Sequence, residues 1–303
     1  MKKRTKWLLT GTGSVLAGLV ISLLIHTNLQ KTYKVGEFDP SENAYFAGTI
    51  DDPAGLIKAH KFVTPTDDKY NSQKTRSLGT SLIGDIESTW SAYTGKGTTV
   101  AILDDGFDVD QPEFTRSDGT SAILSTSRYY YSNSAGTKYY FKEYSEEPSC
   151  IKEDWEQVDD NEYEWATHGT NTSSTAAAPM NNDGGVGIAP DADILALKID
   201  FSFAALEGAI RYAVDQGVDV INMSLGAYAE SFTDGWGDSQ SGYSSTATYL
   251  DSACQYAYNH GVIVVAAAGN ESTWHKSYPA CNYKVVGVGA IGDYISTTFV
   301  LSL

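Results

Sequence analysis

The stretch Trp165-Ala166-Thr167-His168-Gly169-Thr170 carries the residue best suited to chemistry in this chain. A histidine followed by Gly-Thr and a run of small residues is typical of a helix that begins there and packs closely on a sheet. Histidine titrates near neutral pH, so at the mouth of a site it can accept and return a proton. By itself, His168 reads more simply as a capped structural histidine, so its role depends on its companions.

Two further polar residues follow apolar strands. The β-branched run 98–103 is typical of a buried parallel strand and stops at Asp104-Asp105-Gly106. The run 262–268 is a similar strand and leads into Gly269-Asn270. Because α/β sheets build their sites at the carboxyl ends of parallel strands, we expect Asp104 and Asn270 to lie near His168.

Strands and helices alternate along the part of the chain that carries these residues. Alternation of this kind predicts an α/β fold in which helices cover both faces of a parallel sheet. Helical spacing is expected over 81–93, from 168 onward, over 203–214 and over 249–259, and strands over 98–103, 193–199, 218–226, 262–268 and 285–290.

Four motifs in order resemble the subtilisin-like serine proteases (subtilases, peptidase family S8), over roughly residues 85–290. They are Asp104-Asp105-Gly106, His168-Gly169-Thr170, Asn222-Met223-Ser224-Leu225-Gly226 and Ala268-Gly269-Asn270. The resemblance implies the subtilisin-like version of the predicted fold, and serine endopeptidase activity on polypeptides in extended conformation.

The resemblance also assigns roles by position. Asp104, two residues before the glycine, would orient His168, which would act as general base and then as general acid. The Asn270 amide would donate to the oxyanion of the reaction. Ser224, Leu225 and Gly226 match the strand that pairs with the substrate backbone.

The family's nucleophilic serine stands in a Gly-Thr-Ser-x-Ala segment well beyond the asparagine. No such segment follows Asn270 in these 303 residues. The two similar stretches, at Ser81 and Ser121, both precede His168 and therefore stand on the wrong side of it in chain order. We expect a catalytic domain truncated before its serine, incomplete at the C-terminus and without triad-dependent activity.

A calcium site is implied by the same resemblance. The loop 179–186 lies where many family members wrap a cation, and Glu113 lies where the family supplies a carboxylate. Carboxylate, amide and carbonyl oxygens suit calcium. A metal-free Asn/Gly turn remains an equal alternative. The candidate ligands are Glu113, Pro179, Asn181, Asp183 and Gly185.

The amino-terminal segment predicts a membrane anchor or a signal peptide. Four basic residues among the first six precede an uncharged run over 7–25, which is long enough to span most of a bilayer core. We expect a single-pass anchor in residues 1–30 with the peptidase domain outside the cytoplasm, in the cell membrane. A cleaved signal peptide and a secreted protein are the alternative.

The rest of the chain divides into two expected parts. Residues 31–80 read as a spacer or a pro-segment, and residues 81–303 as the partial peptidase domain. Within that domain, the tyrosine-rich and acidic segment 115–165 reads as an insertion. It could be a solvated surface excursion or an aromatic wall of the substrate cleft.

Composition excludes some functions. A net charge of −17 argues against a nucleic-acid partner, whose phosphates need a basic surface. The three cysteines, Cys150, Cys254 and Cys281, lack the spacing of a zinc site, and one disulfide is possible. Three readings remain: an anchored outward-facing endopeptidase, a non-catalytic pseudo-protease that binds peptides, or a gene fragment.

Overall fold

The structure is a computed structural model and describes most of the expected peptidase domain. The predicted anchor over 7–25, most of the spacer, Ser81 and the tail from 290 onward lie outside the described residues. Within the described part, no helix combines the length and the apolar character needed to cross a membrane. The described residues are 65–71, 73, 86–153, 155–157, 163–165, 168–235, 237–242, 250–271 and 273–289.

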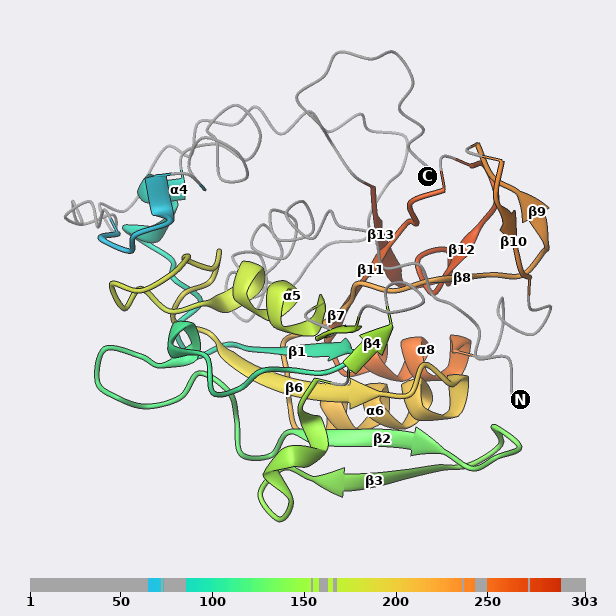
Figure 1. Cartoon of the computed structure of the whole chain (residues 1–303), viewed down its shortest axis with the longest axis horizontal. Coiled ribbons are helices and arrows are strands. Elements are labelled where there is room, and N and C mark those ends of the chain that lie inside the picture. The colour runs from blue at the N-terminus through green and yellow to red at the C-terminus, as the bar shows by residue number, and fades with distance from the viewer. Residues whose placement is uncertain are drawn as a thin grey trace.

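A central sheet of seven strands organises the domain (Figure 1). Its order is β13-β11-β7-β1-β6-β2-β3; neighbouring strands are parallel except β2 and β3, which are antiparallel. The strands are β1 (Thr99–Asp104), β2 (Arg128–Ser132), β3 (Tyr139–Glu143), β6 (Asp193–Ile199), β7 (Val220–Met223), β11 (Ile263–Ala267) and β13 (Val285–Val288).

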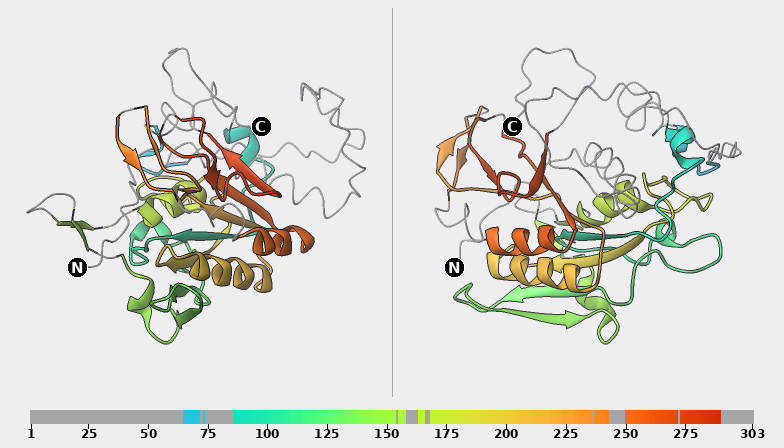
Figure 2. Two further views of the ribbon diagram at one scale, coloured as in Figure 1. Left: turned by 90° about the vertical axis from the view of Figure 1, so that its right-hand side faces the viewer. Right: turned by 180° about the vertical axis from the view of Figure 1, so that it is seen from behind.

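Helices cover both faces of this sheet, as the sequence predicted. In Figures 1 and 2, α5 (His168–Ala177) lies over one face, and α6 (Phe203–Asp215) and α8 (Asp251–Asn259) lie over the other. The predicted α/β fold with a largely parallel sheet is therefore confirmed.

Alternation along β1 explains how the two layers form. Ala101 and Leu103 belong to the apolar core beneath α6 and α8. Val100 and Ile102 point the other way and belong to the core beneath α5. A central strand that is buried on both faces must be apolar throughout. The four residues before Asp104, from Val100 to Leu103, are all apolar and buried.

Part of the segment 115–165 departs from the expectation of a solvated excursion. β2 joins the central sheet parallel to β6, and Tyr130 at its middle is buried. The tyrosines of this segment are in part strand residues of β2 and β3, because aromatic side chains suit a pleated, half-buried surface. Beyond β3, the segment forms the 3-10 helix η2 (Pro148–Ile151) and the antiparallel pair β4 (Trp155–Gln157) and β5 (Tyr163–Trp165).

Residues assigned to the spacer also belong to the domain. Tyr70 is buried and packs against Trp90, whose indole nitrogen donates to the Ile188 carbonyl at 2.9 Å. Trp90 ends the short helix α4 (Ile86–Trp90). The packed domain therefore includes residues 65–71 and 73, which lie upstream of the boundary expected at residue 81.

Smaller elements lie beyond the end of β7. β8 (Ala227–Tyr228) pairs with β12 (Ser277–Tyr278), and β9 (Phe232–Thr233) pairs with β10 (Ser239–Gln240). The three cysteines are free thiols: Cys150 and Cys254 are buried and Cys281 is exposed. The disulfide that the sequence left open is thus not formed.

Candidate active site

The fold brings Asp104 and His168 together from elements 64 residues apart in sequence. Asp104 is the last residue of β1 and His168 is the first residue of α5. Since α5 packs on β1 with small side chains, its first turn lies directly over the carboxyl end of that strand. Gly169 is essential to this approach, because a Cβ there would lie 2.9 Å from the Asp104 Cβ.

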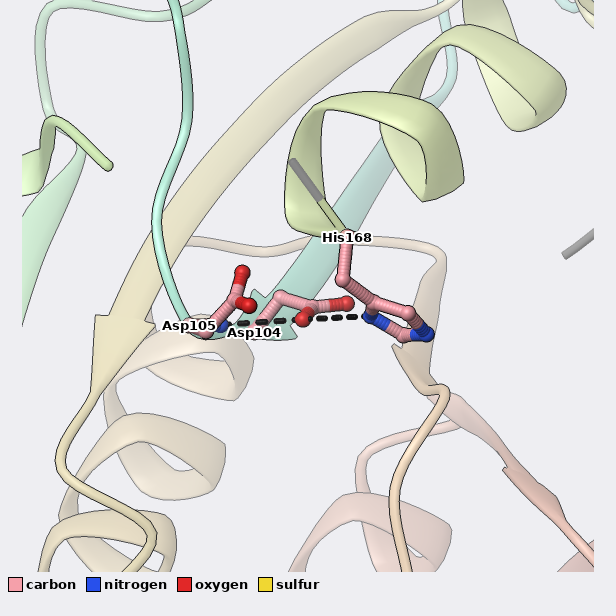
Figure 3. A group of neighbouring side chains, drawn as sticks. All are labelled: Asp104, Asp105 and His168. Atoms are coloured by element: carbon pink, nitrogen blue, oxygen red, sulfur yellow. Dashed lines mark hydrogen bonds and ion pairs between the residues drawn. The ribbon is translucent and has the colours of Figure 1, made fainter. Parts of the chain in front are cut away.

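The two side chains form a hydrogen-bonded pair (Figure 3). His168 Nδ1 lies 2.8 Å from Asp104 Oδ1. Asp104 is 1% exposed, whereas the His168 side chain is 23% exposed. A carboxylate only accepts, so Nδ1 donates and Nε2 is left as a base. A buried acid that orients a partly exposed histidine is an arrangement for proton transfer.

Asp105 is a third ionisable group at the same place. Its backbone N–H donates to Asp104 Oδ1 at 2.9 Å, and its own Oδ1 accepts from the Gly169 N–H at 3.0 Å. Burial, and then the neighbouring Asp104 charge, raise the pKa of Asp105 to about 7. Sequence reasoning considered Asp105 only as the weaker match for the catalytic acid.

The segment 150–153 braces the turn after β1. The Phe107 N–H donates to the Ile151 carbonyl at 2.9 Å, and Lys198 Nζ donates to the Lys152 carbonyl at 2.7 Å. Thr170 in α5 accepts from the Asp108 N–H at 2.8 Å. The Thr170 hydroxyl in turn donates to Glu153. No local sequence pattern predicts this brace, because its parts are far apart in the chain.

The expected oxyanion and substrate residues lie at the same edge of the sheet. Ile102, Asn222 and Val265 are in register across β1, β7 and β11, so the ends of these strands lie side by side. Ser224 follows β7 and is buried, and its hydroxyl accepts from Asn222 Nδ2 at 3.0 Å. Leu225 is also buried.

Gly226 and Asn270 follow β7 and β11 at the same edge of the sheet. A Cβ on Gly226 would overlap with the Ser277 hydroxyl, so the β7 and β12 segments meet closely there. Asn270 is exposed, and its backbone N–H donates to the Glu271 carboxylate at 2.6 Å. Within the described residues, its side-chain amide has no hydrogen-bond partner and is available to a bound molecule.

Ser121 lies at the other end of the sheet. Ile123, two residues later, bridges to Ile194 near the start of β6, whereas Asp104 pairs with Lys198 near its end. Four strand residues correspond to roughly 13 Å along the sheet. Ser121 is therefore too far from His168 to act as its nucleophile.

The predicted calcium loop is also assembled from distant segments. Glu113 Oε1 accepts from the Gly185 N–H at 2.7 Å, and Asn181 Oδ1 accepts from the Asp183 N–H at 2.9 Å. Pro179, at the start of this loop, is buried. Carboxylate and amide oxygens of this kind fit a hard cation, and in this structure both accept from backbone N–H groups.

Sequence reasoning missed two groups at this loop. Gln73 holds both backbone atoms of Val186, accepting from its N–H at 2.9 Å and donating to its carbonyl at 3.2 Å. Buried Asp67 accepts from the N–H groups of Asn181 and Asn182 at 2.9 and 3.0 Å. Both lie in the part of the chain read as a spacer.

Another metal arrangement is available at the pair itself. Asp104, Asp105 and His168 each offer a ligand atom within 4.8 Å of the others. His168 Nδ1 and Asp104 Oδ1 are already joined by their hydrogen bond, and the Asp105 carboxylate accepts from the Gly169 N–H. We read the cluster as an acid–base site.

Comparison with known proteins agrees with this geometry. The model of the family described as "Subtilase family" matches residues 95–299. An intracellular serine protease of Paenibacillus polymyxa is 29% identical over 67% of this chain and 52% of its own length. Subtilisin E of Bacillus subtilis is 28% identical over 66% of this chain and 42% of its own length. This chain thus spans about half the length of such relatives.

Solved structures give a weaker likeness. The nisin leader peptidase NisP of Lactococcus lactis matches with 25% identity and a TM-score of 0.42, over 68% of this chain and 59% of that one. Fervidolysin of Fervidobacterium pennivorans matches with 22% identity and a TM-score of 0.46, over 78% of this chain and 31% of that one. The resemblance read from the motifs is confirmed by the family match over most of the described sheet and both residues of the pair. The chain belongs to the subtilase family.

Proposed function

We propose that this chain supplies the acid–base part of a serine endopeptidase that hydrolyses peptide bonds in polypeptides outside the cytoplasm. The observation that carries the proposal is the 2.8 Å hydrogen bond between His168 Nδ1 and buried Asp104. In a serine peptidase, the histidine takes the proton of the attacking hydroxyl and returns it to the leaving amine. Asp104 fixes the tautomer in which Nε2 carries no proton, as the first transfer requires, and it stabilises the imidazolium in between.

The rest of the sheet edge serves the substrate in this proposal. The exposed Asn270 amide donates to the oxyanion, and a donor of this kind contributes about 3 kcal/mol of barrier lowering in such enzymes. The Ser224–Gly226 segment pairs with the extended substrate backbone, which is tolerant of substrate sequence. The substrate is therefore proposed as a polypeptide, with no preferred side chain assigned.

Calcium has a structural part in the proposal. Glu113, Pro179, Asn181, Asp183 and Gly185 would hold the ion through side-chain and backbone oxygens. A bound cation would neutralise the Glu113 charge and fix the loop. It takes no part in the reaction.

Location is proposed from the amino end of the chain. The basic residues before the uncharged run 7–25 support a single-pass anchor that leaves the peptidase domain outside the cytoplasm. Secretion after removal of this run is the alternative. A fusion of residues 1–30 to a reporter, followed by membrane extraction and protease accessibility, separates the two.

The first test uses the 303-residue chain alone. Since no Gly-Thr-Ser-x-Ala segment follows Asn270, a fluorophosphonate probe should label no serine of this chain. Labelling at Ser121 or Ser81, lost in His168→Ala, would contradict the proposal. The measurement is mass spectrometry of the labelled peptides, with a heat-denatured sample as the control for nonspecific reaction.

The second test concerns the coding sequence past codon 303, read in all frames. If a Gly-Thr-Ser-x-Ala segment is encoded there, the longer protein should cleave casein. In that protein, Asp104→Asn and His168→Ala should lower kcat by about four to six orders of magnitude, with KM nearly unchanged. Peptide binding by a folded chain without any such segment would favour a pseudo-protease, and an unfolded product would favour a gene fragment.

A further inference from the structure

Asp105 contacts Asp104 through its backbone N–H and contacts Gly169, the residue after His168, through its side chain. Its backbone N–H donates to Asp104 Oδ1, which is the oxygen that also accepts from His168. Its side chain accepts from the Gly169 N–H, in the first turn of α5. In Figure 3 the Asp105 carboxylate turns toward that turn of α5, and Asp104 lies between it and the imidazole. Asp105 therefore joins the end of β1 to the start of α5.

The charge environment of Asp105 is dominated by the pair. The Asp104 charge raises the pKa of Asp105, and the His168 charge lowers it. Such effects are reciprocal: if protonated His168 favours ionised Asp105, then ionised Asp105 favours protonated His168 to the same extent. Among the described residues, the charged side chains on the segments around it are Asp104, Asp108 and Asp110 at and after the end of β1, His168 of α5, Lys152 and Glu153 of the 150–153 segment and Lys198 of β6.

We propose that Asp105 is a positioning residue whose negative charge makes His168 a stronger base, in addition to holding α5 on β1. The backbone contact with Asp104 and the side-chain contact with Gly169 place this charge beside the pair in a fixed geometry. The ligand atoms of Asp104, Asp105 and His168 lie within 4.8 Å of one another, so the interaction is short and partly shielded from water.

The consequence is a coupled titration. Because the pKa of Asp105 is raised to about 7, its carboxyl loses its proton in the range where histidines also titrate. As Asp105 ionises, His168 becomes harder to deprotonate. The two groups therefore titrate as a pair, and a protease using this histidine as base would reach full activity only at a higher pH than one with a neutral residue at position 105.

The inference concerns the pair to which the proposed function assigns catalysis, but its test needs no proteolysis. The 303-residue chain is prepared with ¹³C-labelled histidine, and the ring signals are followed by NMR between pH 4 and 9. The His168 signal is identified by its loss in His168→Gln. In the unsubstituted chain, the His168 curve should show two inflections, and a single inflection would overturn the proposal.

Two substitutions separate charge from hydrogen bonding. Asp105→Asn and Asp105→Ser both keep an oxygen that can accept from the Gly169 N–H, and both remove the charge. Each should lower the midpoint of the His168 titration by about one pH unit and leave a single inflection. The matched control is Glu146→Gln, which removes one exposed carboxylate elsewhere and should leave the curve unchanged.

The outcomes are distinct. If both Asp105 variants keep the midpoint of the unsubstituted chain, Asp105 acts only as a structural link and the proposal is wrong. If a variant does not fold, the two-inflection test on the unsubstituted chain still decides. Failure of this proposal leaves the protease proposal intact, because that depends on Asp104 and His168.

The pH dependence of the free energy of unfolding provides an independent test of the raised pKa of Asp105. A carboxyl whose pKa is raised on folding holds its proton in the native state between about pH 4 and pH 7, where the unfolded chain releases it. This contribution to stability is complete below pH 4 and is lost as the pH rises through 7. Asp105→Asn should therefore gain stability relative to the unsubstituted chain from pH 5 to pH 8, measured by urea unfolding. An equal difference at both pH values would contradict the raised pKa.

Discussion

At the residue scale, the hydrogen-bonded pair of Asp104 and His168 requires a residue without a side chain at position 169. A Cβ there would overlap with the Gly106 carbonyl oxygen and approach the Asp104 Cβ to 2.9 Å. The neighbours are backbone and a short buried side chain, so neither can turn away. The first turn of α5 can reach the end of β1 only because position 169 has no side chain.

Gly169→Ala should therefore push α5 away from β1. We expect a loss of about 3 kcal/mol in the free energy of unfolding, together with a longer or broken contact between Asp104 and His168. Urea unfolding measures the first effect and the His168 ring signals measure the second. Gly289→Ala is the matched control, since a Cβ there meets nothing within 4 Å, and equal stability of both variants would refute this account.

Sequence motifs could predict Asp104 and His168 but not what holds them. The pair is recognisable because a carboxylate at a strand end and a histidine before Gly-Thr are local patterns. Asp105 could not be assigned a role, since its importance comes from the Gly169 N–H, 64 residues away. The same holds for Gln73, whose only signal is its contact with Val186 in the fold.

At the element scale, the 150–153 segment connects three parts of the site. Thr170 is the link, because its hydroxyl lies between the Asp108 N–H of the turn after β1 and the Glu153 carboxylate of the segment. Burial raises the pKa of Glu153, so this carboxyl depends on its few polar neighbours. The segment thus braces both the turn and the helix that carry the pair.

Thr170→Val keeps the shape of the side chain and removes the hydroxyl. The Asp108 N–H and the Glu153 carboxylate would both lose a partner, so we expect a loss of about 2 kcal/mol in the free energy of unfolding. Thr126→Val, at an exposed threonine, should change stability by less than about 0.5 kcal/mol. Denaturant unfolding of the two variants compares them, and equal losses would show that the link is unimportant.

The sequence predicted most elements of the sheet and its helices close to their observed bounds. The strand over 193–199 and the helix over 203–214 could be predicted because the spacing of their apolar residues matches the faces that they bury. The segment 115–165 was misjudged in part, since it was expected to be an insertion, either a solvated excursion or an aromatic wall, whereas β2 belongs to the central sheet. β2 is recognised as a strand of the central sheet through its pairing with β6 and β3, which a local pattern does not contain.

At the scale of the whole molecule, the proposed calcium loop joins three distant parts of the chain. Asp67 and Gln73 contact it from the amino-terminal side, Glu113 contacts it from the 3-10 helix η1 (Pro112–Phe114), and the loop itself follows α5. Binding of a cation here would stabilise tertiary structure, since the ligands are not close together in the unfolded chain.

Calcium should therefore raise the melting temperature of the 303-residue chain, and chelation should lower it. At a calcium concentration 100 times Kd, the stabilisation would be about 2.7 kcal/mol. Glu113→Gln should remove most of the calcium-dependent increase, whereas Glu146→Gln should retain it. Calorimetry with and without calcium measures the effect, and an identical increase in Glu113→Gln would exclude this site.

The position of β1 in the sheet has a consequence for synthesis. Both of its neighbours, β6 and β7, come later in the chain, and β7 ends 119 residues after β1. At ribosomal rates of about 5–20 residues per second, β1 waits roughly 6–24 seconds before its second edge can be covered. During that time an apolar strand with open edges is exposed to other chains. The strand that carries the proposed catalytic carboxylate should thus benefit from a chaperone or from high dilution while the chain folds.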